Sequence, residues 1–226
     1  GYHKPKRALA LLSREEIGRL MRGFAALGLW KIRLTGGEPT LRAGFEEIAA
    51  TIAAVPGIRR VAMTTNGYRL AKRAEAYRAA GIAAINISID SLNTDRFHAI
   101  TGHDRLAEVL AGLDAARAAG FDSIKVNTVL MRGVNDDELD AIVDFVTERE
   151  LSLRFIEVMR TNDNPGFFAR HHMPGTSVVA QLERRGWSRM AHQAGAGPAI
   201  EYAHPETTGR IGIIAPYEPD FCASCN

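Results

Sequence analysis

The feature that most constrains the fold of this chain is a regular alternation of strand-like and helix-like segments. Apolar residues with a period of two predict strands, and apolar residues three and four positions apart predict helices. Five strands are predicted, at 31–34, 60–63, 84–89, 124–130 and 153–158. Helices are predicted at 13–28, 45–52, 70–80, 106–119 and 135–149. Such alternation favours a parallel sheet joined by right-handed crossovers.

Residue signals at the helix ends refine this prediction. Ser13 and Glu16 form a capping-box pattern that predicts the start of the first helix, and Gly28 predicts its end. Asn135 with Glu138 predicts another start. Because the series opens on a helix, we expect a first strand upstream of residue 1, which would bring the sheet to six strands.

The predicted fold class is therefore α/β, a partial (βα)6 barrel related to the eight-stranded TIM barrel. An open doubly wound sheet is the alternative. We expect residues 1–160 to form the partial barrel and residues 161–226 a small C-terminal α+β extension. In that extension, 162–175 has the composition of a long loop, 177–185 predicts a helix, and 200–202 and 210–214 predict strands.

Composition excludes several classes of protein. The net charge is +2 with both signs scattered, which argues against a nucleic-acid binder. No run of 18 apolar residues is present, so we expect no membrane partner. Two cysteines, Cys222 and Cys225, are too few and too close for a disulfide scaffold, and a reducing, cytoplasmic compartment is expected.

Charged and polar residues alternate with apolar ones along the predicted strands. In a βα barrel the apolar face packs against helices, so the polar face lines the lumen. The residues placed there are Lys31, Arg33, Asn86, Ser88, Lys125, Asn127 and Arg154. Several cations close together and out of water repel one another, and an anion such as a triphosphate would relieve that repulsion. The alternative is that some of them lie at strand ends and reach solvent.

A glycine pair follows the first predicted strand, in Thr35-Gly36-Gly37-Glu38-Pro39. Two glycines let the backbone approach a ligand closely, and Pro39 keeps the residue before it extended. A plain strand-to-helix turn is the simpler interpretation of Gly-Gly alone, but Gly-Gly-Glu-Pro directly after a strand is much rarer.

Gly36-Gly37-Glu38-Pro39 resembles the GGEP motif of radical S-adenosylmethionine (SAM) enzymes. Further segments, in order along nearly the whole chain, resemble the GTP 3′,8-cyclases, the molybdenum cofactor biosynthesis protein A family. These segments are 31–42, 64–67, 86–92, 100–102, 124–127, 133–136, 154–159, 197–199 and 222–226.

The resemblance implies cofactor and substrate residues. The residues implied for SAM are Gly36, Gly37, Glu38, Ser88 and Met159, the last at its adenosine part. The residues implied for GTP, mostly at its phosphates, are Lys31, Arg33, Thr64, Lys125 and Arg154. The second set overlaps the lumen cations. In this family SAM is reduced to a 5′-deoxyadenosyl radical that removes the 3′ hydrogen of GTP, and the ribose then bonds to C8 of guanine.

The family also implies two [4Fe–4S] clusters. Cys222 and Cys225 would be two of three ligands to the C-terminal cluster. The C-x-x-x-C-x-x-C motif for the SAM cluster is expected before Gly1, and the third C-terminal cysteine after Asn226, so the chain is expected to be truncated and inactive alone. Half a zinc site or a redox pair is the alternative interpretation of the two cysteines.

Two other functions remain alternatives. One is a radical SAM enzyme with an auxiliary cluster that acts on a peptide. The other is a cluster-free paralogue that only binds nucleotides. For the cyclase, the expected partners are GTP, an electron donor and the next enzyme of the molybdopterin pathway, and a homodimer is left open. His171 and His172 are interpreted as surface residues.

Overall fold

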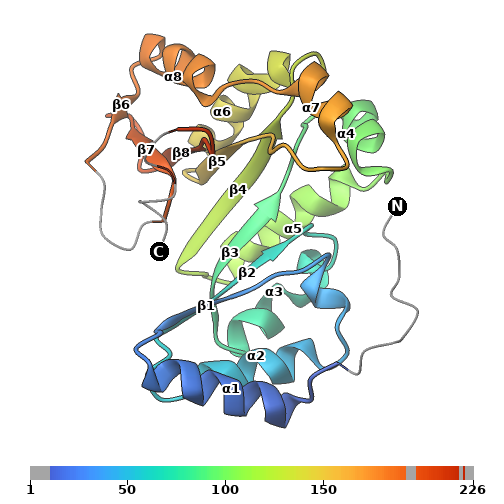
Figure 1. Ribbon diagram of the computed structural model, residues 1–226, viewed down its shortest axis with the longest axis vertical. Coiled ribbons are helices and arrows are strands. Elements are labelled where there is room, and N and C mark those ends of the chain that lie inside the picture. Colours follow the sequence, from blue (N-terminus) through green and yellow to red (C-terminus); the bar gives the residue numbers. More distant parts are fainter. Residues whose placement is uncertain (1–10, 192–196, 219–220, 222–226) are drawn as a thin grey trace.

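The computed structural model describes residues 11–191, 197–218 and 221, and one continuous sheet runs through them. Its eight strands lie in the order β1-β2-β3-β4-β5-β8-β7-β6 (Figure 1). Strands β1 to β5 and β8 are parallel, while β7 and β6 are antiparallel to their neighbours. The strands are β1 (Lys31–Leu34), β2 (Arg60–Thr65), β3 (Ile82–Ser88), β4 (Ser123–Leu130), β5 (Ser152–Glu157), β6 (Ser188–Arg189), β7 (Ile200–Ala203) and β8 (Arg210–Ile214).

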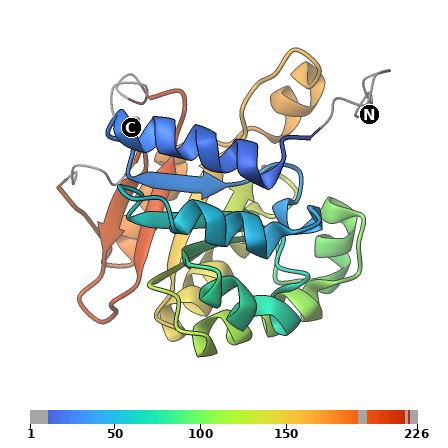
Figure 2. The ribbon, with the colours of Figure 1, turned by 90° about the horizontal axis from the view of Figure 1, so that it is seen from below.

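Helices connect the parallel strands, with α1 to α3 at one end of the curved sheet and α6 to α8 at the other (Figure 1). In Figure 2, α1 and α2 lie along the β1 edge, where a carbon added at Gly18 of α1 would lie 3.2 Å from Thr51 of α2. The helices are α1 (Arg14–Ala26), α2 (Phe45–Ala53), α3 (Leu70–Ala79), α4 (Thr94–Thr101), α5 (Leu106–Ala118), α6 (Leu139–Glu148), α7 (Pro165–His171) and α8 (Gly175–Arg184), with 3-10 turns η1 (Pro39–Leu41) and η2 (Asp136–Glu138).

The core lies between these helices and the apolar face of the strands. Ile85 and Ile87 of β3 are fully buried, as are Leu113 of α5 and Ile142 of α6. Burying a large aliphatic side chain stabilises a fold by about 1.5–3 kcal/mol, so this face fixes the helices. The opposite face of the strands is left to polar residues. The α/β fold class and the five βα strands are confirmed.

The first capping box is confirmed and the second is wrong. Ser13 N donates to Glu16 Oε2 at 2.7 Å, and Glu16 N donates to Ser13 Oγ at 3.2 Å. Asn135 makes no such cap, because its side chain bonds to Met131, Asp90 and Val129 of neighbouring segments. Side chains that a local pattern predicts to cap a helix can instead form hydrogen bonds with neighbouring segments of the fold.

Residues 162–175 are not one long loop. Asn164 precedes Pro165, which is the first residue of α7, and proline is favoured at that position because its missing N–H is not needed there. Two further elements, α4 and β6, were not predicted.

The C-terminal part of the chain continues the sheet. β8 pairs in parallel with β5, from Leu153 opposite Ile211 to Ile156 opposite Ile214. The described residues therefore hold six parallel strands, the sixth of them from the C-terminal part. None of the described helices has both the length and the apolar character needed to cross a membrane.

Candidate functional site: a cationic cavity below a glycine turn

A polar cavity of about 210 Å³ opens on the face of the sheet that the helices leave uncovered. Its lining residues are Lys31, Arg33, Arg60, Ala62, Ala84, Asn86, Ser123, Lys125, Arg154, Glu201 and Arg210. Six of these side chains are cationic, and among the described lining residues Glu201 is the one carboxylate. We call this feature the cationic cavity. The structure thus brings together Lys31, Arg33, Lys125 and Arg154, while Arg60, Arg210 and Glu201 were not foreseen.

Strand register explains why these side chains share one face. Lys125 lies opposite Asn86 on β3, and Arg154 lies opposite Asn127 on β4. Neighbours in register on parallel strands point to the same side of a sheet. Gly212 of β8 lies opposite Arg154 and leaves space for its side chain. A carbon added at Gly212 would lie 3.4 Å from Arg154 Cγ and 3.2 Å from Ala199 Cβ.

The cavity holds its cations at an electrostatic cost. The pKa of Lys125 is lowered to about 8, chiefly by burial and then by repulsion from Arg154, while attraction to Glu201 acts in the opposite direction. Burial, followed by repulsion from Arg154, also lowers the pKa of Arg33. For Lys31 the causes are burial and then Arg33. Like charges in a half-buried space favour an anionic ligand, because it would reverse these penalties.

Some polar atoms at this site have no partner within the protein. Among the described residues, the buried Arg154 Nε, Arg60 Nε and Asn127 Oδ1 make no hydrogen bond. Most buried polar groups in folded proteins are paired, so each of these requires an explanation. Arg60 and Arg154 line the cavity, so a bound ligand or ordered water there would pair their Nε atoms.

The glycine turn lies at the carboxyl end of β1, above the cationic cavity. Gly36 has φ = +152°, and a carbon added at Gly36 or Gly37 would meet no described atom within 4 Å. Only glycine adopts such a conformation readily, and the space in front of both residues is open. Residues 36 and 37 are three and four positions beyond Arg33, roughly 10 Å along an extended chain. This turn fits a close ligand approach of the kind expected for SAM.

Glu38 fixes the turn against the end of β2. Its Oε1 accepts from Thr40 N at 3.1 Å, from Thr40 Oγ1 at 2.7 Å and from Thr65 Oγ1 at 2.9 Å. Its Oε2 accepts from Asn66 N at 2.7 Å. Both carboxylate oxygens are therefore used by the protein itself, and a cofactor contact by Glu38 stays a prediction. This role could not be predicted from local sequence, because Thr65 and Asn66 lie more than 25 positions beyond Glu38.

The remaining predicted residues lie around the same strands. Thr64 Oγ1 accepts from Arg33 Nη1 at 3.3 Å, beside the cationic cavity. Ser88 ends β3 in register with Asn127, on the polar face and not on the helix-packed face. Met159 is 57% exposed, two residues beyond β5. Gly37, Ser88 and Met159 therefore all lie at carboxyl ends of parallel strands, the same end of the sheet.

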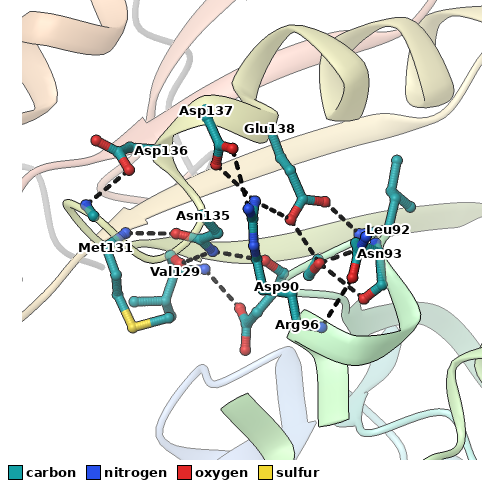
Figure 3. A network of polar contacts seen from close by, with 12 residues as sticks. Asp90, Leu92, Asn93, Arg96, Val129, Met131, Asn135, Asp136, Asp137 and Glu138 are labelled. Atoms are coloured by element: carbon teal, nitrogen blue, oxygen red, sulfur yellow. Dashed lines mark hydrogen bonds and ion pairs between the residues drawn. The ribbon is translucent and has the colours of Figure 1, made fainter. Parts of the chain in front are cut away.

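A polar network fixes the loops that follow β3 and β4 (Figure 3). Asn135 Nδ2 donates to Asp90 O at 2.6 Å and to Val129 O at 2.9 Å, and Met131 N donates to Asn135 Oδ1 at 2.8 Å. Arg96 lies between Asp137 and Glu138 and bonds to both at 2.6 Å. This network holds the loop after Ser88 in place.

Asp90 is the titratable group of that network nearest Ser88. Burial raises its pKa, and the hydrogen bond from Val129 N to Asp90 Oδ1, at 2.8 Å, works in the opposite direction. Glu138 accepts from Ser91 Oγ at 2.7 Å and from Leu92 N at 2.8 Å, which explains why its side chain makes no capping hydrogen bond at the start of α6.

The interpretation of His172 as a surface residue is wrong. Its Nε2 lies 2.6 Å from Oε1 of Glu157, a buried carboxylate at the end of β5. The ring also stacks on Phe168, with centroids 4.4 Å apart. His171 Nδ1 lies 3.0 Å from the Arg132 carbonyl oxygen. The pair of histidines therefore anchors α7 to the sheet and to the loop after β4.

Cys222 and Cys225 lie outside the described residues, so the structure does not test them. Within the part of the chain that is described, no three or more His, Cys, Asp or Glu side chains gather as a metal site would require.

Comparison with known families divides the chain into two matching parts. The Radical SAM superfamily model matches residues 2–146, and the Molybdenum Cofactor Synthesis C model matches residues 151–226.

Curated relatives match almost the entire chain. A protein named GTP 3′,8-cyclase from Stenotrophomonas maltophilia (strain R551-3) is 55% identical over 212 residues, which cover 94% of this chain and 65% of the relative. A protein of the same name from Yersinia pestis is 49% identical over 224 residues, which cover 99% of this chain and 69% of the relative. The chain thus spans about two-thirds of the length of these relatives.

Solved structures support the fold. The crystal structure of Streptococcus suis SuiB bound to S-adenosylmethionine matches with a TM-score of 0.61 and 14% sequence identity, over 81% of this chain and 43% of SuiB. At this identity the likeness concerns the fold, which is that of a radical SAM core.

Proposed function

This chain belongs to the radical SAM superfamily and, within it, to the GTP 3′,8-cyclase family, and from that premise we propose that its protein is a lyase acting on GTP. The reaction converts GTP to (8S)-3′,8-cyclo-7,8-dihydroguanosine 5′-triphosphate, the first step of molybdenum cofactor biosynthesis. Residues 1–160 supply the partial barrel in this proposal, and residues 161–226 the extension with part of an auxiliary cluster site.

The cationic cavity is the observation that supports a triphosphate substrate most directly. Lys31, Arg33, Lys125 and Arg154 hold the phosphates, and Thr64 orients Arg33 through the 3.3 Å hydrogen bond. Hydrogen bonds between charged donors and phosphate are roughly twice as strong as neutral ones. An anchored triphosphate also fixes which ribose hydrogen faces the glycine turn, and such orientation is a large part of catalysis.

The open turn at Gly36 and Gly37 is proposed to receive the amino acid part of SAM, with Ser88 beside it, Met159 at the adenosine and Glu38 holding the turn in place. SAM and two [4Fe–4S] clusters, when bound, supply the radical chemistry, while the protein binds, orients and shields. Cys222 and Cys225 are proposed ligands of the second cluster. An electron donor, the next enzyme of the molybdopterin pathway and a cytoplasmic location complete the proposal.

A peptide substrate is the competing proposal. The six cations around one cavity argue against it, because they favour a polyanion, which a peptide substrate need not be. A cluster-free nucleotide-binding paralogue is distinguished by iron, since the cyclase in its full natural length should bind about eight irons when it is purified without oxygen.

Binding of GTP and of guanosine tests the substrate proposal. We expect Arg33→Ala and Lys125→Ala, in the full-length protein, each to weaken GTP binding by about 1.5–3 kcal/mol, roughly tenfold or more, and to leave guanosine nearly unchanged. The physical reason is that each substitution removes one charged contact to phosphate. Isothermal titration calorimetry under anaerobic conditions measures both ligands.

The matched control is Lys72→Ala, which removes a cation from the exposed side of α3. It should bind both ligands like the unchanged protein. Equal loss of GTP and guanosine in the cavity variants would mean that these residues shape the fold and do not hold phosphate.

A further inference from the structure

We propose that the cationic cavity binds the triphosphate as its magnesium-free anion, and that Glu201 limits the affinity by pairing with two cavity cations. This inference rests on the proposed function and states in which ionic form the substrate enters. It follows from the charges and donor types that line the cavity.

The charge of the lining matches a highly charged anion. Six cationic side chains face one carboxylate among the described lining residues, a formal excess of five positive charges. Magnesium is a divalent cation and would cancel two of the negative charges of the triphosphate. The complex would therefore be attracted less strongly to the six cationic side chains. Repulsion from Arg154 already adds to burial in lowering the pKa of Lys125 and of Arg33, so the lining disfavours a further cation.

The donor types also disfavour magnesium. Mg²⁺ in nucleotide sites is held by one or two protein carboxylates together with water and phosphate oxygens. In the described lining the only carboxylate is Glu201, and its oxygens are already engaged. Oε1 lies 3.5 Å from Lys125 Nζ, and Oε2 lies 3.4 Å from Arg210 Nη1. The other side chains that face the space are mainly N–H donors, which suit phosphate oxygens and not a metal ion.

Glu201 is positioned as an internal counter-charge. It lies on β7, opposite Gly212 of β8, and its side chain is only 16% exposed. Its attraction to Lys125 partly opposes the pKa decrease caused by burial. An arriving triphosphate competes with Glu201 for Lys125 and Arg210 and is repelled by it. Removal of this negative charge should therefore tighten anion binding.

The first test measures GTP binding to the unchanged full-length protein, with EDTA and then with enough MgCl2 to complex nearly all the nucleotide. We expect the apparent affinity to fall roughly tenfold or more with magnesium, the equivalent of at least one charged contact. Equal or tighter binding with magnesium overturns the inference while leaving the proposed function in place. No GTP binding in either condition overturns both.

The second test uses Glu201→Gln, with Glu206→Gln as the matched control, since Glu206 is exposed and does not line the cavity. In EDTA, Glu201→Gln should bind GTP more tightly, by roughly threefold to tenfold, and Glu206→Gln should show no change. If Glu201 were a magnesium ligand, its removal would instead weaken binding in MgCl2 and not tighten it in EDTA. That result would overturn the inference.

Discussion

Lys125 shows that a residue suited to binding an anion can destabilise the protein that carries it. It is half-buried, it lies near Arg154, and its pKa of about 8 is well below the ordinary lysine value of 10.5. The unfolded chain therefore holds the proton more tightly than the folded one between these two pH values. Under those conditions stability increases with pH, because protons are released on folding.

We predict that Lys125→Met raises the stability of the ligand-free protein, by on the order of 2 kcal/mol at neutral pH. The gain should shrink as the pH rises from neutral toward about 10, because Lys125 in the unchanged protein then loses its charge in the folded state and the penalty disappears. Differential scanning calorimetry across this range measures the difference. A gain that is constant with pH, or a loss, would contradict the prediction, and Lys72→Met serves as the control.

Residues whose role depends on their own strand could be predicted from the sequence, whereas residues whose partners lie far away could not. Lys31, Arg33, Lys125 and Arg154 follow from strand alternation, since a side chain's face is set by its position in the strand. Glu38 and Glu201 are different. Glu38 bonds to residues 65 and 66, and Glu201 faces Lys125, contacts that depend on which strands become neighbours.

At the scale of the elements, α5 packs closely against the start of α3 at Gly112. Gly112 of α5 is buried, and a carbon added there would lie 2.8 Å from the Gly67 carbonyl oxygen and 2.9 Å from Leu70 Cβ. Gly23 in α1 is also helical, but a carbon added there would meet no described atom within 4 Å. The same substitution should therefore have opposite effects in the two helices.

We predict that Gly112→Ala destabilises the protein by about 1–3 kcal/mol, because the clash exceeds the gain in helix propensity. Gly23→Ala should stabilise it by roughly 0.5–1 kcal/mol, since only the propensity changes. Urea unfolding followed by circular dichroism gives both values. Stabilisation by Gly112→Ala would show that α3 and α5 are free to move apart.

A helix start could be predicted from the sequence where the capping side chains have no competing partners elsewhere in the fold. Ser13 and Glu16 bond to each other at the exposed start of α1, so the capping-box prediction was correct. Asn135 and Glu138 show the same spacing, but loops after β3 and β4 compete for their side chains. In α7, the proline that suggested a loop is instead the first residue of a helix.

At the scale of the whole molecule, the continuous sheet ties residues 161–226 to the parallel strands. β8 pairs with β5 on one side and β7 on the other, and Trp187, just before β6, is buried. Trp30, just before β1, lies at the opposite edge of the sheet and contacts Arg59. The βα alternation predicted the parallel strands, but the insertion of β8 beside β5 is a long-range pairing that no local pattern specifies.

We predict that the protein unfolds in one cooperative transition. The chain has two tryptophans, so Trp30→Phe and Trp187→Phe each leave one fluorescence reporter, at opposite edges of the sheet. In each variant, the guanidinium midpoint seen by fluorescence should coincide with that seen by far-UV circular dichroism, as expected of a two-state unit. Midpoints that separate in either variant would instead indicate that two parts unfold independently.

The position of β8 also has a consequence for how the sheet is built during synthesis. β8 is the last described strand to leave the ribosome, yet it lies in the interior of the sheet. Until it emerges, β5 remains an open edge, and β7 and β6 have no connection to the parallel strands. Such a nascent chain exposes the unpaired edge of β5 while residues 158–209 are being added, which makes it a candidate for protection by chaperones.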